Sequence, residues 1–156
     1  MEPAGVRRLL ERAKELDPKQ WSIWMAESAI RRSESGSWVD LGKDTEALAR
    51  RAVELNSNPF TNSQLAYALD SRAVWDNNKR FHDQAIVVYG RAENLAPVHI
   101  LPRVALLDIY RNSLQNKAKS QKTQQAILAT IPPKIRLSAS AKSYLRQKGI
   151  PIPMGR

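Results

Sequence analysis

The stretch Phe81-His-Asp-Gln-Ala-Ile-Val-Val-Tyr-Gly-Arg-Ala-Glu-Asn-Leu-Ala-Pro97 carries small and apolar side chains at helical spacing and ends in a proline. Offsets of 0, 3, 4, 7 and 10 place five of them on one face of a helix: Ala85, Val88, Tyr89, Ala92 and Leu95. The same offsets occur 40 and then 39 residues earlier, over positions 45–55 and 6–16. A face that returns at a nearly constant interval predicts a helical repeat architecture, with these side chains buried.

A second kind of apolar segment follows a proline in each interval. These segments are Trp21–Ala26 after Pro18, Leu65–Leu69 after Pro59, and Val104–Tyr110 after Pro97. Because proline cannot continue a helix, each unit is predicted to hold a helix A, a loop and a helix B, closed by a proline turn. The polar stretches Ser33–Lys43 and Ser71–Lys79 predict long loops between helices A and B.

The composition agrees with a soluble domain that has one core, and the helical periodicity predicts the all-α class. The chain has 156 residues, of which 42% are hydrophobic and 26% are charged, and no run approaches the roughly 20 apolar residues that span a bilayer. We expect a single domain over 1–156, divided into a B-type helix at 1–17, repeat units at 18–58, 59–96 and 97–131, and a basic cap with an extended tail at 132–156. Since the first helix lacks an upstream partner, we expect a C-terminal part of a longer protein; the alternative is an N-terminal capping helix.

The positive charge is concentrated toward the C-terminus. Residues 1–108 hold 15 basic and 15 acidic side chains, whereas ten basic residues and no acid follow Asp108. Such a region attracts nucleic acid or the anionic headgroups of a membrane surface. The predicted basic surface consists of Lys117, Lys119, Lys122, Lys142 and Arg146.

The stretch 81–97 resembles the second helix of a tetratricopeptide repeat (TPR). Ala85, Tyr89, Ala92 and Pro97 fall on the small, aromatic, small and proline positions of that motif. The resemblance implies αα-hairpins stacked into a right-handed superhelix, with about three to four units and a C-terminal capping helix. The interval of 39 or 40 residues exceeds the family's usual length of about 34, and we expect the surplus in the A-to-B loops. The alternative fold is a helical bundle without repeats.

A TPR-like fold implies a non-catalytic module that binds a protein or peptide segment in a groove lined by its A helices. We selected polar or aromatic positions on these helices as candidate partner-binding residues. They are Asn62, Tyr67, Arg72, Arg103 and Arg111. The sequence leaves the oligomeric state open.

A second resemblance covers the end of the chain. The segment Leu128-Ala-Thr-Ile-Pro-Pro-Lys-Ile135, followed by a basic helix, resembles the end of the soluble C-terminal domain of Wzy-type polymerases and O-oligosaccharyltransferases, the pilin glycosylation ligases. This resemblance implies a periplasmic domain behind a membrane-embedded catalytic part. No catalytic motif of that family falls on this chain. Without this resemblance a cytoplasmic location is expected, and the absence of cysteine fits both compartments.

Nucleic acid is the alternative partner. Trp21 and Trp24, together with Glu27, resemble the half-a-TPR repeats of RNA-processing proteins, and the acid-free region adds electrostatic attraction. Against this role, the basic region contains two aromatic residues, Tyr110 and Tyr144, and both are expected to be buried.

The sequence predicts no catalytic, metal or cofactor site in these residues. His82 and His99 have no second histidine at metal-binding spacing, and there is no cysteine to complete a metal site. The glycines form no phosphate-binding loop, and the acidic residues form no recognisable acid–base pair. We therefore expect an interaction module rather than an enzyme.

Overall fold

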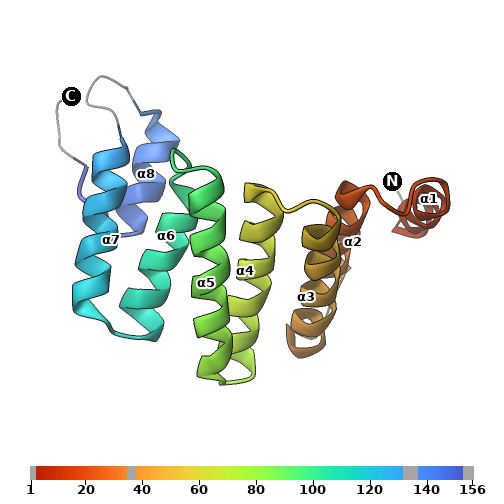
Figure 1. The fold of residues 1–156 in the computed structure, drawn as a ribbon, viewed down its shortest axis with the longest axis horizontal. Helices are drawn as coiled ribbons and strands as arrows, with labels where there is room; N and C mark the ends of the chain where they lie inside the picture. Colours follow the sequence, from red (N-terminus) through yellow and green to blue (C-terminus); the bar gives the residue numbers. More distant parts are fainter. Residues whose placement is uncertain (1–2, 35–37, 132–136, 153–156) are drawn as a thin grey trace. The chain divides into compact units, whose positions relative to one another are not determined.

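The structure is a computed structural model that describes residues 3–34, 38–131 and 137–152. These residues form eight α-helices and one π-helical turn, and consecutive helices pack as antiparallel pairs (Figure 1). The all-α class predicted from the sequence is therefore confirmed. The chain divides into two compact units, residues 1–95 and 96–156, which are described in turn.

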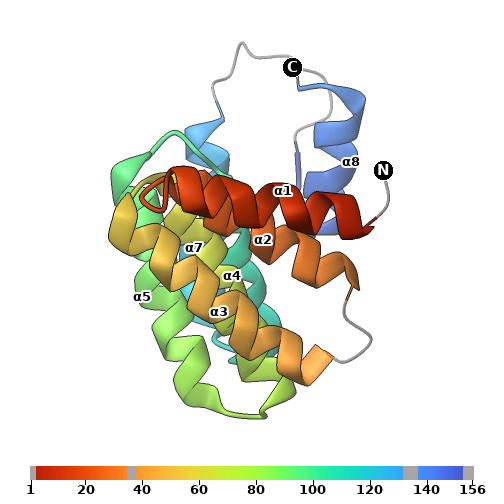
Figure 2. The same cartoon turned by 90° about the vertical axis from the view of Figure 1, so that its right-hand side faces the viewer.

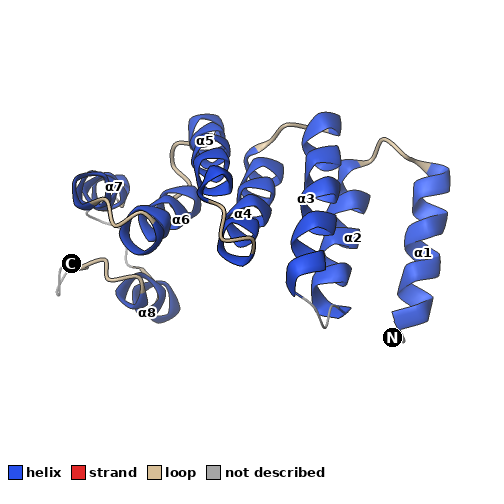
Figure 3. Ribbon diagram, turned by 90° about the horizontal axis from the view of Figure 1, so that it is seen from below, coloured by secondary structure: helices blue, strands red, loops and turns tan. Residues whose placement is uncertain are grey.

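The first unit contains five helices. They are α1 (Pro3–Leu16), α2 (Trp21–Glu34), α3 (Trp38–Leu55), α4 (Pro59–Trp75) and α5 (Lys79–Leu95). The helices α3, α4 and α5 run side by side (Figure 1), and α2 packs against α3. Helix α1 lies along α2 (Figures 2 and 3).

The start of α4 is set by local hydrogen bonds. The Asn58 side chain accepts from the backbone N–H groups of Phe60 and Thr61, each at 2.9 Å, and the Thr61 hydroxyl accepts from the Asn58 N–H at 3.1 Å. This reciprocal capping box satisfies backbone donors that an uncapped helix leaves unpaired. Pro59 occupies the first turn, where its missing N–H costs nothing.

The repeated face is buried most completely on α5. Ala85, Val88, Tyr89 and Ala92 are buried, as predicted, and the small side chains of Ala85 and Ala92 allow α4 to approach closely. The prediction for Leu95 was wrong, because its side chain is 51% exposed. Leu95 is the last residue of α5, where the contact between the paired helices ends.

The same face is partly buried on α3 and less buried on α1, where its five side chains are half-buried or exposed. Ala49 and Ala52 are buried on α3, whereas Leu9 and Leu16 on α1 are exposed. Burial of the repeated face therefore increases along the chain from α1 to α5.

The expectation of long A-to-B loops was wrong. Helix α4 continues to Trp75, and only the turn over 76–78 separates it from α5; likewise α3 already begins at Trp38. Asn77 has φ 45°, a conformation that asparagine tolerates better than most residues, so three residues suffice to reverse the chain. Most of the residues predicted to form these loops therefore belong to helices. The side chain of Trp38 lies outside the described residues.

Two cations hold a buried carboxylate between α1 and α2. Glu27 Oε2 lies 2.7 Å from Lys14 Nζ, and Glu27 Oε1 lies 2.9 Å from Arg31 Nη2. Burial acts to raise the pKa of Glu27, but the hydrogen bonds from Lys14 and Arg31 outweigh it and lower that pKa below its ordinary value. Glu27 therefore stays charged at neutral pH and links the first two helices.

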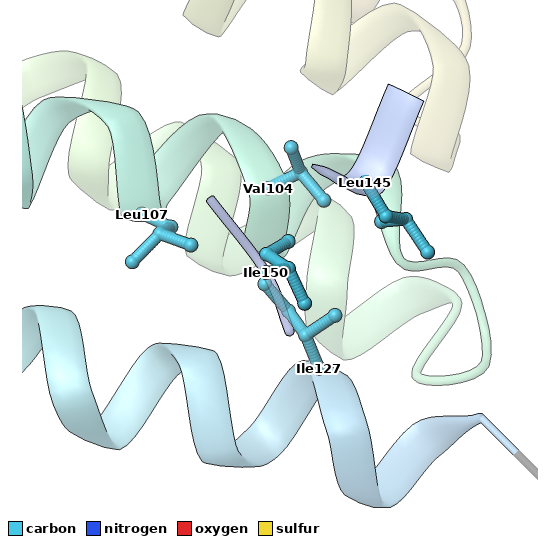
Figure 4. Close-up of a cluster of buried hydrophobic side chains, with 5 residues drawn as sticks. All are labelled: Val104, Leu107, Ile127, Leu145 and Ile150. Atoms are coloured by element: carbon cyan, nitrogen blue, oxygen red, sulfur yellow. The ribbon is translucent and has the colours of Figure 1, made fainter. Parts of the chain in front are cut away.

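The second unit contains α6 (Leu101–Asp108), the π-helical turn η1 (Ile109–Ser113), α7 (Lys117–Thr130) and α8 (Ala139–Gln147). Its core is a cluster of five buried side chains: Val104, Leu107, Ile127, Leu145 and Ile150 (Figure 4). Ile150 follows α8, so part of the segment predicted as an extended tail is packed into this core. Gly149, with φ 64°, makes the turn that brings Ile150 inward.

No helix in the described ranges combines the length and the apolar composition needed to cross a lipid bilayer.

Candidate binding surface

The five candidate partner-binding residues lie in different environments. Asn62, Tyr67 and Arg72 belong to α4 in the first unit, whereas Arg103 and Arg111 belong to α6 and η1 in the second.

Asn62 is buried, with 1% of its surface exposed. Its amide donates to the Ser57 hydroxyl at 3.0 Å and to the Asn58 carbonyl at 2.9 Å. These bonds fasten the segment that precedes α4 to the helix itself. A partner reaches this side chain only if that segment moves.

Arg72 connects three helices. Its Nη1 lies 2.5 Å from Glu46 Oε2 on α3, and its Nη2 lies 3.1 Å from Asp76 Oδ2. Its guanidinium carbon also lies 4.0 Å from the centre of the Phe81 ring on α5. Burial acts to lower the pKa of Arg72, but the hydrogen bonds to Glu46 and Asp76 raise it above the ordinary value. The charge of Arg72 is thus engaged within the first unit.

Tyr67 is exposed and belongs to an apolar row along α4, which we call the α4 stripe. Phe60, Tyr67 and Val74 stand seven residues apart, so they align on one face of the helix, and they are 52%, 51% and 60% exposed. The hydroxyl of Ser71, which lies between Tyr67 and Val74, donates to the Tyr67 carbonyl at 2.9 Å. This hydroxyl is therefore satisfied by the helix backbone, and the row remains apolar.

The α4 stripe continues onto α2 through an aromatic pair. The ring centroids of Trp21 and Phe60 are 6.1 Å apart and their planes are inclined by 57°, a common geometry for interacting aromatic side chains. Both residues stand at the beginning of their helices. The exposed row on α4 thus adjoins the half-buried Trp21 of α2.

The spacing of Phe60, Tyr67 and Val74 was visible in the sequence. Three large side chains at intervals of seven residues align on a helix, but this pattern alone does not distinguish a buried row from an exposed one. The predicted candidates therefore include Tyr67 but not Phe60 or Val74, although Phe60 is also an aromatic residue on this helix.

In the second unit, both candidate arginines bind other parts of the same unit. Arg103 donates to the Thr130 hydroxyl on α7. Arg111 donates to the Lys148 carbonyl at 2.7 Å and to the Gln124 side chain at 3.1 Å. Arg111 therefore fastens the segment that follows α8 to η1 and α7.

The net positive charge of the chain lies in the second unit. Residues 1–95 contain 14 basic and 14 acidic side chains, whereas residues 96–156 contain 11 basic side chains and the single carboxylate of Asp108. Lys148 forms an ion pair with that carboxylate, so no other side-chain carboxylate in this unit offsets the remaining cations.

Most of the predicted basic surface is exposed. Lys117, Lys119, Lys122 and Arg146 are exposed and Lys142 is half-buried. The Lys119 ammonium lies 5.2 Å from the centre of the half-buried Tyr110 ring. The expectation that Tyr144 is buried was wrong, because it lies on the outer side of α8 while its neighbour Leu145 enters the core.

The histidines lie apart from any cluster of metal ligands. His82 is buried, with Nδ1 2.9 Å from Asp70 Oδ1, and His99 is exposed. Within the described ranges, no group of three or more His, Cys, Asp or Glu side chains is arranged to hold a metal ion.

The segment that resembles the membrane ligases overlaps residues that the structure does not describe. Its residues 132–135 lie outside the described ranges, so that resemblance stays a prediction. No protein-family model matches the sequence, and no curated protein matches it.

Proposed function

We propose that this chain is a non-catalytic, TPR-like helical-repeat module that binds a protein or peptide segment through the α4 stripe. In this proposal the hairpins follow the right-handed superhelical plan of that repeat class, with α2 and α4 as A helices and α3 and α5 as B helices. The proposal is supported by the order of the helices and by the repeated small and aromatic positions on α5.

The observation that carries the proposal is the exposure of the α4 stripe. Burial of apolar surface that was exposed to water stabilises a complex by about 25 cal/mol for each Å². A row of such side chains on one helix face, joined to a second helix by an aromatic pair, matches the anchoring surfaces of peptide-binding helical proteins. A partner that covers this row recovers that free energy.

The test compares the α4 stripe with equally exposed apolar residues elsewhere. Peptides are selected from a random display library on the immobilised full chain, and their affinities are measured by fluorescence anisotropy. The variant Phe60→Ser/Tyr67→Ser/Val74→Ser should reduce the affinity for apolar peptides at least tenfold. The control Leu9→Ser/Leu16→Ser should leave that affinity unchanged. Equal affinities for wild type and the stripe variant, with helicity retained, refute the proposal.

A second candidate function rests on the charge of the second unit. Ten net positive charges on 61 residues, with Tyr144 exposed beside them, favour binding of single-stranded nucleic acid. The test measures RNA and DNA affinity over a salt series for the wild type and for Lys117→Glu/Lys119→Glu/Lys122→Glu. Nucleic-acid binding predicts a steep loss of affinity with salt and a further loss in the variant. A weak, flat response eliminates this function.

A further inference from the structure

A cleft of about 440 Å³ opens within the first unit between α3, α4 and α5. Its inner wall includes Leu65 and Leu69 of α4, which are buried against the neighbouring helices, and Val88 of α5. At 100° per residue, Leu65 and Leu69 lie on the side of α4 opposite the α4 stripe. The cleft is therefore a different surface from the one proposed above, and the inference does not depend on the stripe.

The α5 side of the cleft has basic ends, and Val87 lies between them together with the polar side chains of Asp83 and Gln84. Arg80, Val87 and Arg91 stand seven and then four residues apart, which places them on one face of α5, and all three are exposed. The two arginines are eleven residues apart in sequence, which corresponds to about 16 Å along the helix. Val87 lies between them as an exposed apolar contact.

Two of these arginines have no partner for their charge. In the part of the chain that the structure describes, neither the Arg80 nor the Arg91 guanidinium has a hydrogen bond or an ion pair. Arg50 lies on the α3 side of the cleft and is exposed, but its charge is offset by Glu46, whose Oε1 lies 2.7 Å from Arg50 Nε. Among the described residues that line the cleft, Asp83 is the single carboxylate.

The charge is local to the cleft. The first unit has equal numbers of acidic and basic side chains. Its net charge is therefore zero, and it does not attract polyanions in general. Three arginines around a small apolar depression attract instead a ligand that carries negative charge on both sides of an apolar group. The volume lies in the range of about 300–1,000 Å³ that is typical of ligand-binding clefts, so it suits a few side chains of a peptide.

We propose that this cleft binds an acidic peptide segment. One apolar side chain of the segment packs against the exposed side chain of Val87, above the buried floor that Leu65 and Leu69 form. Carboxylates on either side of it pair with Arg80 and Arg91, for which arginine's planar set of donors is well suited. The partner is thus an acidic protein segment with a central aliphatic or aromatic residue.

The experiment uses the full chain and peptides of defined charge. Twelve-residue peptides are selected from a random display library, resynthesised with a fluorophore, and titrated against wild type and Arg80→Glu/Arg91→Glu. The matched control is Arg8→Glu/Lys43→Glu, which changes the charge equally at two exposed positions that do not line the cleft. Circular dichroism verifies that each variant keeps its helicity.

We expect enriched peptides with Asp or Glu on both sides of an apolar residue. Their affinity should fall at least tenfold in Arg80→Glu/Arg91→Glu and in Val87→Asp, and it should be unchanged in the control and in the α4 stripe variant. The inference is overturned if no acidic peptides are enriched, or if those enriched bind Arg80→Glu/Arg91→Glu as tightly as wild type. It is also overturned if they lose affinity only in the α4 stripe variant, an outcome that supports the proposed function alone.

Single-stranded RNA provides a further test of the partner class. If RNA displaces the acidic peptide from wild type, and its own affinity also falls in Arg80→Glu/Arg91→Glu, the cleft binds nucleic acid and the proposal is wrong. If RNA leaves the peptide bound, the assignment to an acidic protein segment is supported.

Discussion

Replacement of Ile150 by alanine tests whether the segment after α8 is part of the core of the second unit. The Ile150 side chain is 1% exposed and belongs to the same buried cluster as Val104, Leu107 and Leu145. Truncation removes three carbon atoms, which corresponds to about 2.4 kcal/mol at 0.8 kcal/mol per buried methylene group. The cavity left behind adds to this cost, so we expect a loss of about 3 kcal/mol in the free energy of unfolding of the second unit.

The assay must report on the second unit by itself. All four tryptophans lie in the first 75 residues, so their fluorescence would follow the first unit. Hydrogen exchange measured by mass spectrometry resolves peptides from α6 and α7. A loss of about 3 kcal/mol predicts exchange faster by about two orders of magnitude for their best protected amides, while peptides from α4 provide an internal reference.

The matched control is Leu101→Ala, which truncates an aliphatic side chain at an exposed position on α6. It should change exchange in α7 by less than a factor of about five, because surface substitutions stay within about 0.5 kcal/mol. If Ile150→Ala has as little effect as Leu101→Ala, the segment after α8 is not packed in the core and the reasoning is refuted.

Three further outcomes are expected. Tyr89→Ala should destabilise the first unit by about 3–5 kcal/mol in urea unfolding followed by tryptophan fluorescence, whereas Leu95→Ala should cost less than about 1 kcal/mol, because only Tyr89 is buried; equal costs would contradict this packing. Gly149→Ala should destabilise the second unit by about 1–2 kcal/mol in hydrogen exchange, because the site has φ 64° and an added Cβ would lie 2.7 Å from Arg111 Nη1; unchanged exchange would contradict this. Glu27 has a lowered pKa in the folded state, so its contribution is complete above its unfolded pKa of about 4.5 and is lost as pH falls through the folded value. Acid titration of the free energy of unfolding should therefore be less steep below pH 4.5 in Glu27→Gln, and identical slopes would count against this role.

Local patterns in the sequence predicted much of the first unit. The offsets on α5 predicted the buried positions Ala85, Val88, Tyr89 and Ala92, and Pro59 marked the beginning of α4. Loop lengths were predicted poorly, because polar residues such as those after Ser71 occur equally well on the exposed side of a long helix. A polar stretch indicates a loop only where the spacing of the apolar residues around it is incompatible with a continuing helix.

The candidate site could be predicted only in part. Tyr67 and Arg72 are five residues apart on the same helix, and both met the criterion of a polar or aromatic A-helix position. Tyr67 is exposed, whereas Arg72 contacts Glu46 and Phe81. These contacts join residues 26 and 9 positions apart in sequence, so no local pattern reports them.

The amino-acid sequence alone shows the helix faces, the proline breaks, and the neutral first two thirds and basic last third of the chain, because these properties depend on residue type and spacing. Which side chains remain available for a partner depends on the packing of α3, α4 and α5, and on the return of Ile150 to the core of the second unit. Exposure is a property of the neighbours that cover a residue rather than of the residue itself. For this reason the α4 stripe and the arginine-lined cleft, on opposite sides of one helix, emerge only from the three-dimensional arrangement.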